Sequence, residues 1–446
     1  MPSRVKSLGA SMKSKFYTDE TSEEEKNMPT DSFYDQAAKE TLRAAAARIQ
    51  SQGPETPAAE GQPVTQVASH VEEPVVAESA SPPPLAQPHA APAAVAPESD
   101  YGGFDDFDFV EAYDDEPAAG SDLLLPDNTA KSAIRCAFIG VGGAGGKLAK
   151  GFLDLGFNKT LLVNTTVKDQ PEGVSADHFL LLPGADGVGK DIALGKRVLE
   201  NNSASVEDAI RTRIGSVDWI FVLAGGGGGT GSACHILQAS LERYLQSVGA
   251  SGQTVYIVTK PTAQELLNPT ITDNYESLMS DVALHPHILI DNEKQLHLLR
   301  GKVGMLDLYP SANRNFAKLF TQVLKLANEN SPIQSFDSKD LERVLSTTGR
   351  MVVGSTVVRD VSNSDLGSIL YQGCLKSSPC PSPAGKASTG AMLLIVTPAM
   401  ASDPSVSRKL EAAFSYVGGR TDTLFSGVYV KQPLPGLIAI SMIGGF

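Results

Sequence analysis

From Ile134 onward the sequence predicts an α/β protein built on a doubly wound, mainly parallel sheet. Short apolar runs of strand length alternate with segments whose apolar residues have helical spacing, and glycine-rich stretches follow three of these runs. This alternation is typical of parallel sheets, which bind ligands at the carboxyl ends of their strands. We expect one domain over residues 133–308, a long central helix over 309–330, and a smaller α+β domain over 331–446.

The expected elements follow from apolar spacing. Strands are predicted where short apolar runs occur, at residues 134–140, 160–163, 179–182, 217–223, 254–258, 391–397, 423–430 and 437–443. Helices are predicted where apolar residues recur three or four positions apart or where a capping residue precedes a helix-forming stretch, at 148–155, 191–201, 233–245, 309–328 and 338–349.

Residues 1–132 are predicted to be a disordered, acidic extension. Residues 51–100 contain 10 prolines and 11 alanines with few large apolar side chains, a composition that cannot form a packed core. Residues 1–132 also hold 24 of the 51 acidic residues but only 9 of the 37 Lys and Arg residues, so the rest of the chain is nearly neutral.

The composition excludes several classes of protein. A nearly neutral folded part lacks the clustered positive charge of a nucleic-acid surface. The 4 cysteines show no metal-ligand spacing and are too few for a disulfide framework. No apolar run reaches the length of a membrane-spanning helix, and no secretory leader is recognisable near Met1, so we expect a cytoplasmic protein.

The stretch from Gly225 to Gly231 is the strongest local signal. Five consecutive glycines follow the apolar run 219–223, and a helical pattern follows Ser232. Glycine loses more conformational entropy on folding than any other residue, so a run of five indicates that another group approaches this backbone closely. A glycine turn between a strand and a helix N-terminus favours phosphate binding, because free N–H groups and the helix dipole face the turn.

Two further glycine stretches bear on the nature of the ligand. Residues 140–145 match the G-x-G-x-x-G pattern of dinucleotide-binding proteins, but the following strand ends in Asn164-Thr-Thr rather than in the acid that would hold a ribose. Lys147 and Lys190 are not followed by the hydroxyl residue of a P-loop. Three glycine turns, at 142–146, 184–189 and 225–231, suit a triphosphate better than a pyrophosphate. A dinucleotide-dependent oxidoreductase remains a remote alternative.

The motifs together resemble those of the tubulin/FtsZ superfamily, and of FtsZ in particular, over essentially all of residues 133–446. The matching segments occur in the family's order: IGVGGAGGKLA, LLVNTT, GADGVGKDIALGK, FVLAGGGGGTGSA, IVTKPTAQE, ILIDNEKQL, SFDSKDLERVLSTTGRMVVGS and IGGF.

This resemblance implies a GTPase that assembles head to tail, with GTP or GDP as ligand and Mg²⁺ accompanying the nucleotide; no metal-ligating residue is assigned. Tyr309 would stack on guanine and Asn313 would hydrogen-bond its edge, although Tyr309 could instead be a capping core aromatic. The resemblance assigns nucleotide contacts to Gly142, Gly143, Ala144, Gly145, Gly146, Lys147, Asn164, Gly187, Val188, Gly189, Gly227, Gly228, Gly229, Thr230, Gly231, Ser232, Pro261, Glu265, Asn292, Tyr309 and Asn313.

The resemblance also assigns catalytic roles to Asp337 and Asp340. In the family two acids of this segment enter the nucleotide site of the next subunit and act on the attacking water. A structural role is open as well, because Asp337 is a plausible helix N-cap and Asp340 would favour the helix dipole.

Four positions depart from the family pattern: Lys147 replaces an amide, Thr166 an acid, Pro269 an arginine and Ser335 an asparagine. Binding is expected to survive these changes, whereas turnover could be slow. A second reading is therefore a nonhydrolysing or nonpolymerising paralogue that regulates another filament.

The expected partners are further copies of this chain, and a second FtsZ is a further candidate. The sequence ends at Phe446, directly after an expected strand, where FtsZ proteins usually continue into a linker and an adaptor-binding tail. Residues 98–122 contain 10 acidic residues, no basic one and spaced aromatics. We hypothesise that this segment docks an adaptor and localises the protein to a division ring or another filament; deleting it should then abolish localisation without affecting assembly.

Overall fold

A computed structural model describes residues 132–446 of the chain. The predictions made for residues 1–131, including the disordered extension and the adaptor-binding segment 98–122, lie outside the described residues. Within 132–446 no helix is both long and apolar enough to cross a lipid bilayer.

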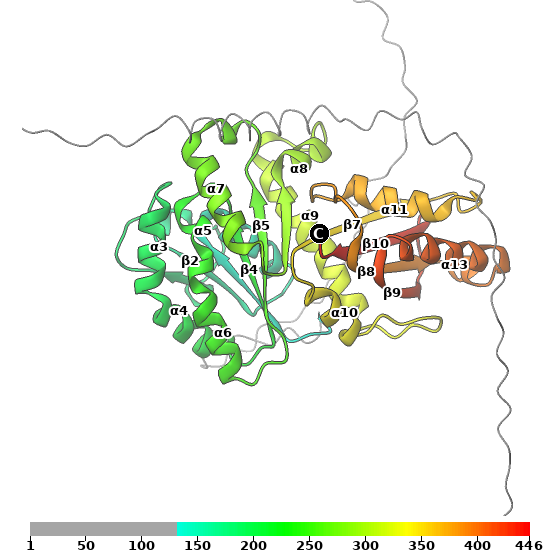
Figure 1. Ribbon diagram of the computed structural model, residues 1–446, viewed down its shortest axis with the longest axis horizontal. Coiled ribbons are helices and arrows are strands. Elements are labelled where there is room, and N and C mark those ends of the chain that lie inside the picture. The colour runs from blue at the N-terminus through cyan, green and yellow to red at the C-terminus, as the bar shows by residue number, and fades with distance from the viewer. Residues whose placement is uncertain (1–131) are drawn as a thin grey trace, which may run out of the picture. The chain divides into compact units, whose positions relative to one another are not determined.

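In the described part of the chain one ten-stranded sheet forms the centre of the molecule, in the order β3-β2-β1-β4-β5-β6-β7-β10-β8-β9 (Figure 1). Its strands are β1 (Cys136–Val141), β2 (Thr160–Asn164), β3 (Phe179–Leu181), β4 (Trp219–Gly225), β5 (Thr254–Lys260), β6 (His287–Asp291), β7 (Arg350–Val358), β8 (Ala387–Val396), β9 (Thr421–Val430) and β10 (Leu437–Gly444). Strands β1 to β6 are parallel, β10 runs antiparallel to both β7 and β8, and β8 is parallel to β9.

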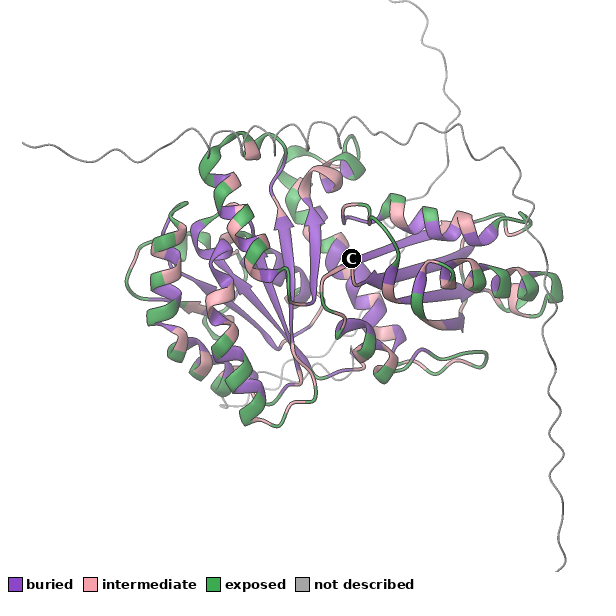
Figure 2. Ribbon diagram, viewed as in Figure 1, coloured by how far each residue is buried: buried purple, intermediate pink, exposed green. Residues whose placement is uncertain are grey.

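Helices cover both faces of the sheet and bury its strands (Figure 2). The helices are α2 (Gly142–Leu153), α3 (Ile192–Asn201), α4 (Ser203–Ala209), α5 (Gly229–Ser232), α6 (Gln238–Ser247), α7 (Pro269–Val282), α8 (Asn292–Leu299), α9 (Leu308–Leu326), α10 (Ser338–Leu345), α11 (Leu366–Ser377), α12 (Pro398–Ala401) and α13 (Pro404–Gly418). Helices α2 and α9 share one apolar core, and α3, α4, α6 and α7 share the other.

Alternation along the parallel strands supplies both cores. Phe138 and Phe221 point to the face covered by α2 and α9, where Phe138 stacks on Phe152 at 4.0 Å between ring centroids. The next residue of each strand, Ile139 and Val222, points to the opposite core. This is the side-chain period of 2 that a strand imposes, here with apolar residues on both faces because both are covered.

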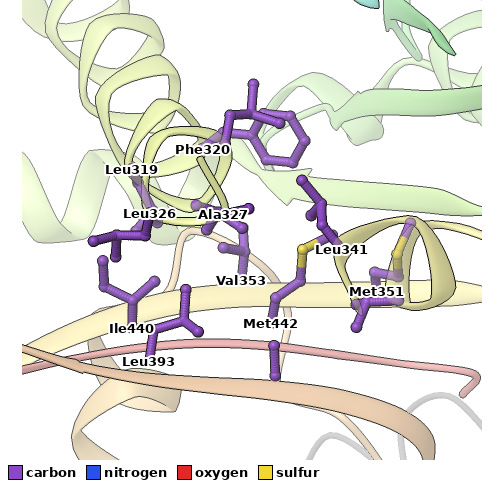
Figure 3. Packing of buried hydrophobic residues seen from close by; sticks show 14 of the residues in the cluster. Leu319, Phe320, Leu326, Ala327, Leu341, Met351, Val353, Leu393, Ile440 and Met442 are labelled. Carbon is purple, nitrogen blue, oxygen red and sulfur yellow. The ribbon is translucent and has the colours of Figure 1, made fainter. Parts of the chain in front are cut away.

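Helix α9 packs against the two parts of the sheet. Phe320 lies against Phe221 of β4 at 5.1 Å between ring centroids, and further along α9 Leu326 lies beside Leu393 and Ile440 of the C-terminal strands (Figure 3). The sheet is also continuous, because β6 pairs with β7 at two positions. The predicted division into domains at residues 308 and 330 therefore stays a prediction, although α9 coincides closely with the expected central helix.

The expected α/β fold class is confirmed, with three kinds of error. Strands β6 and β7 and helices α4, α7, α8, α11, α12 and α13 were not predicted from apolar spacing. The helix expected over 233–245 begins with a 3₁₀ turn at Cys234–Leu237 and continues as α6, and the short helix α5 occupies the end of the expected glycine turn. Residues 142–146, expected as a loop, are the first turns of α2.

A buried histidine gives the fold a pH dependence that can be measured. His287 begins β6, is 4% exposed and donates from Nδ1–H to the carbonyl of His285 at 3.0 Å. Burial lowers its pKa below the ordinary 6.5, with the charges of Arg350 and His285 acting in the same direction. The unfolded chain therefore takes up the proton first as pH falls.

We expect the free energy of unfolding to be retained above pH 6.5 and to fall as the pH drops from there toward the depressed pKa of His287. His287→Gln should reduce this loss by roughly 1 kcal/mol between pH 7 and pH 5. Urea unfolding at both pH values measures it, with the exposed His297→Gln as the control. An equal pH slope in wild type and His287→Gln would contradict the prediction.

Candidate functional site

The candidate functional site is a cavity of about 610 Å³ at the carboxyl ends of the parallel strands. It lies where β1 and β4 are neighbours and the chain leaves them toward opposite faces of the sheet, into α2 on one side and α5 and α6 on the other. This is the topological switch point at which doubly wound sheets bind their ligands.

The first wall of the cavity is the start of α2. Gly142 has φ +73°, and a Cβ there would lie 2.9 Å from the backbone nitrogen of Gly231. A Cβ on Gly145 would lie 2.1 Å from the carbonyl oxygen of Leu223. The glycines therefore let the helix begin immediately and pack directly on β4, which is why residues 142–146 are helix and not loop. The N-cap, Val141, makes no side-chain capping bond, so the first N–H groups of α2 can bind an anion.

The second wall is the glycine turn between β4 and α5. A Cβ on Gly225 would lie 2.6 Å from Cβ of Ala144, and one on Gly229 would lie 2.7 Å from the carbonyl oxygen of Asp191. Gly228 differs, because a Cβ there would meet nothing within 4 Å although the residue lines the cavity. Close packing therefore requires glycine at Gly225 and Gly229, whereas Gly228 between them has free space around it.

The third wall comes from the segments after β2 and β3. The Asn164 side chain accepts from the N–H of Thr165 at 2.8 Å, and Gly187 donates from its N–H to the carbonyl of Thr165 at 2.9 Å. The Thr165 hydroxyl lies 3.4 Å from that of Thr230 in the glycine turn. Gly189 accepts from the N–H of Gly229 at 3.0 Å. Hydrogen bonds therefore connect the segments after β2 and β3 to the glycine turn after β4.

Charged side chains of both signs line the cavity. Lys168 pairs with Asp186 at 3.1 Å, and hydrogen bonds from Lys168 and Thr166 hold the pKa of the Asp186 carboxyl below its usual range. Asp169 approaches the first wall: its Oδ2 would lie 2.8 Å from a Cβ on Gly143. Lys147 is exposed on the same wall. The cavity can therefore offer both cations and a carboxylate to a charged ligand.

The far end of the cavity is aromatic and amide-lined. Tyr309 and Asn313 project from the first turns of α9, and Asn292 begins α8. Tyr309 is 42% exposed, which does not fit the alternative of a capped core aromatic. The Glu265 carboxylate accepts from the N–H and the hydroxyl of Thr262 at 2.8 and 2.9 Å. A ring with an open face and nearby amides can stack on a base and bond its edge.

Most of the residues predicted to contact the nucleotide line this one cavity. They are Gly142, Gly143, Ala144, Lys147, Asn164, Gly187, Val188, Gly189, Gly228, Gly229, Thr230, Gly231, Glu265, Asn292, Tyr309 and Asn313. Their roles toward a ligand stay predictions.

Five predicted residues do not line the cavity: Gly145, Gly146, Gly227, Ser232 and Pro261. Gly145 and Ser232 are buried where α2 and α5 pack on β4, and Gly146 faces the side chain of Leu162. Gly227 packs toward Ile271 and Pro261. These residues shape the backbone behind the cavity wall.

Six lining residues were not predicted as ligand contacts: Thr165, Thr166, Lys168, Asp169, Asp186 and Thr259. The signal that could have found them is position, because they follow strands β2 and β3 within five residues or lie near the end of β5. Asp169 in particular places a carboxylate beside the cavity, five residues after the end of β2, although Thr166 has none.

Asp337 and Asp340 lie away from the cavity, at the start of α10. Asp337 is the N-cap, accepting from the N–H groups of Lys339 at 2.8 Å and Asp340 at 3.0 Å. Burial, together with the charge of Asp337, raises the pKa of the Asp340 carboxyl. The structural role predicted for Asp337 is therefore confirmed, and the catalytic role stays a prediction.

The acidic pair lies at the end of the sheet opposite the cavity. Asp218 precedes β4, at the amino end of the strand; a hydrogen bond from Arg135 is the main cause of its lowered pKa, and the charge of Lys339 on α10 contributes. In Figure 1 the arrow of β5 points toward α7 and α8, whereas α10 lies toward the other end. One chain alone therefore cannot bring Asp340 into its own cavity.

Comparison with known proteins supports this fold. No family model matches the sequence. A curated relative, cell division protein FtsZ 2 of Methanocaldococcus jannaschii, is 27% identical over 262 residues, which are 55% of this chain and 62% of the relative. The match thus spans less than two thirds of that relative.

Two solved structures show the same arrangement. CetZ2 of Haloferax volcanii, a GTPγS-bound protofilament, superposes with a TM-score of 0.56 and 22% identity over 70% of this chain and 92% of that one. The GTPγS-form protofilament of Bacillus thuringiensis TubZ superposes with a TM-score of 0.59 and 16% identity, over 72% of this chain and 90% of that one. By its sequence relative and its fold together, the chain is a member of the tubulin/FtsZ superfamily.

Proposed function

We propose that the protein binds GTP in the cavity between β1 and β4, assembles head to tail, and hydrolyses GTP where two subunits meet. The observation that carries the proposal is the separation of two half-sites on one rigid sheet: the cavity at the carboxyl ends of the strands, and Asp337 with Asp340 beyond their amino ends. Stacking copies along the strand direction joins each cavity to the next subunit's acids.

The cavity suits GTP in shape and in chemistry. The N–H groups at the starts of α2 and α5 would hold the phosphates, because both helix ends lack side-chain caps. Tyr309 would stack on the base and Asn313 would accept from its edge. The protofilament structures of CetZ2 and TubZ carry GTPγS, which supports a guanine nucleotide here.

Magnesium is proposed to accompany the nucleotide. Mg²⁺ in nucleotide sites uses one or two carboxylates together with phosphate oxygens and water. Asp169 fits that requirement, because its carboxylate lies beside Gly143 on the phosphate wall, whereas Asp186 is already paired with Lys168. When bound, the metal would neutralise charge on the phosphates. The described residues contain no group of three metal-ligating side chains.

Hydrolysis requires positioning and charge stabilisation more than covalent chemistry by the protein. In the proposed filament the carboxylates of Asp337 and Asp340 orient the attacking water. Asp340, with its raised pKa, accepts hydrogen bonds from water while the neighbouring subunit excludes bulk solvent. The Lys147 ammonium faces the cavity and favours the negatively charged ligand.

Turnover measured against protein concentration tests the proposal. GTP hydrolysis per subunit should rise steeply above a threshold concentration, and pelleting should begin at the same threshold. Flat, negligible turnover with GTP binding and no pelleting would instead establish the alternative of a nonhydrolysing paralogue. Binding of NAD without binding of GTP would overturn both readings.

A role in cell division is proposed from the name of the curated relative. A fluorescent fusion expressed in dividing cells should collect in the cytoplasm at the division site or along another filament. Co-sedimentation with a purified FtsZ tests the second partner proposed above, and uniform fluorescence throughout the division cycle would contradict the division role.

A further inference from the structure

The segment that carries the acidic pair is attached to the edge strand β9. Gln334 forms a bridge with Val428, whose N–H donates to the Gln334 carbonyl at 2.8 Å. The Gln334 side chain donates to the Ser426 hydroxyl at 2.8 Å, and the Ser331 hydroxyl donates to the Val428 carbonyl. Residues 331–336 thus follow β9 closely before α10 begins.

The last attachment before the acids is the hydroxyl of Tyr429. This residue of β9 is 2% exposed, and its O–H donates to the carbonyl of Leu326, at the end of α9, at 2.7 Å. The same oxygen accepts from the N–H of Phe336 at 3.1 Å. Phe336 is fully buried and directly precedes the N-cap Asp337. One hydroxyl therefore links the central helix, the edge strand and the start of the acidic helix.

The surroundings keep this hydroxyl in place. A Cβ on Gly427 would lie 2.9 Å from the Tyr429 ring and 3.0 Å from Cβ of Phe336, so a glycine is needed for the two rings to approach. Burial is the main cause of a raised pKa at Tyr429, and the charges of Glu329, Asp340 and Asp337 act in the same direction. The hydroxyl stays protonated at neutral pH and remains a donor.

We propose that Tyr429 is a positioning residue that fixes Asp337 and Asp340 for reaction with the nucleotide of the neighbouring subunit. The inference rests on the proposed function. Tyr429 contacts neither the cavity nor the acidic carboxylates; it acts through the backbone of Phe336. Small displacements of a catalytic group are costly to a reaction that depends on orientation, so the hydroxyl should affect turnover without affecting nucleotide binding.

Tyr429→Phe is the first test. GTP turnover in the assembled protein should fall about tenfold, while GTP affinity of the unassembled chain and pelleting stay at wild-type values. Tyr244→Phe is the matched control, because Tyr244 is also buried and its hydroxyl also donates to a backbone carbonyl, that of Gly215, which precedes β4 and is not part of the segment that carries the acids. The control should retain wild-type turnover.

Gln334→Ala is a second variant that does not threaten the core, because Gln334 is exposed. It removes the hydrogen bond to Ser426 and should lower turnover in the same direction by a smaller factor. If Tyr429→Phe proves too unstable to purify, the turnover of Gln334→Ala tests the positioning role instead. Unchanged turnover in whichever of these two variants folds would overturn the positioning role.

Mixed filaments separate positioning from general stability. Asp340→Ala chains have an intact cavity but lack the acid, and Gly228→Trp chains have the acids but a filled cavity. Mixing them should restore turnover at junctions where the second donates to the first. Adding Tyr429→Phe to the Gly228→Trp chain should lower the restored turnover about tenfold; adding it to the Asp340→Ala chain should not.

Equal loss in both placements would show a merely structural role and would overturn the inference. Absence of turnover in the wild-type protein would overturn the proposed function, and the positioning role with it. Normal wild-type turnover with normal Tyr429→Phe turnover would overturn only the positioning role.

Discussion

Asp340→Ala is expected to lower GTP turnover at least roughly 100-fold while filaments still form and persist longer than those of the wild type. The acid lies outside its own cavity, so GTP binding should be unchanged. Burial and Asp337 raise its pKa, so Asp340 takes up a proton at a higher pH than an exposed aspartate does. We therefore expect turnover to fall on acidification sooner than it would with an exposed carboxylate. Phosphate release and pelleting from the same samples measure both effects.

Asp337 needs a design that separates its two roles. It caps α10 through the N–H groups of Lys339 and Asp340, and asparagine can make the same capping bonds without the charge. Asp337→Asn should therefore keep the helix and lose turnover, whereas Asp337→Ala should lose both. Wild-type turnover in Asp337→Asn would assign this residue a capping role alone. Asp403→Ala, which removes the cap of α13, is the control for cap loss elsewhere.

The sequence predicts strands β1 to β5 well because they are short apolar runs, and glycine turns follow three of them. It fails where that contrast is lost. Strand β7 follows α10 after a short turn, and its apolar run has polar residues on both sides and is interrupted by Gly354. A Cβ on Gly354 would lie 2.1 Å from the carbonyl oxygen of Cys374. Packing against a helix elsewhere in the sequence determines that such a segment becomes a strand, and the local spacing of apolar residues does not indicate this.

The candidate site divides in the same way. Glycines can be counted in a sequence, but a glycine that lines a cavity and one that packs behind its wall have the same letter. A side chain at Gly145 would collide with the carbonyl of Leu223, whereas a Cβ at Gly228 would meet no atom of the protein within 4 Å. Asp169 is the converse case: no motif marks it, and only the turn after β2 brings its carboxylate to Gly143. In both cases strand register and turn geometry determine whether the residue reaches the cavity.

Gly228→Trp is expected to abolish GTP binding, with affinity lowered at least about 100-fold, and to leave the fold intact. Gly228 has φ −96° and ψ 163°, an extended conformation that any residue adopts, and a Cβ there meets no atom within 4 Å. Because Gly228 lines the cavity, we expect the indole to occupy it. Substituting Gly229 would be uninformative, because its Cβ would collide with the Asp191 carbonyl.

The fold of Gly228→Trp is checked by its urea midpoint and the binding by titration with a fluorescent guanine nucleotide. Gly419→Trp, at the end of α13 on the C-terminal part of the sheet, is the matched control and should bind normally. If Gly228→Trp folds and still binds GTP with wild-type affinity, the nucleotide does not occupy the cavity between β1 and β4. Loss of binding with a wild-type urea midpoint locates the nucleotide there, because Gly228 lines the cavity and a Cβ at this position contacts no other residue.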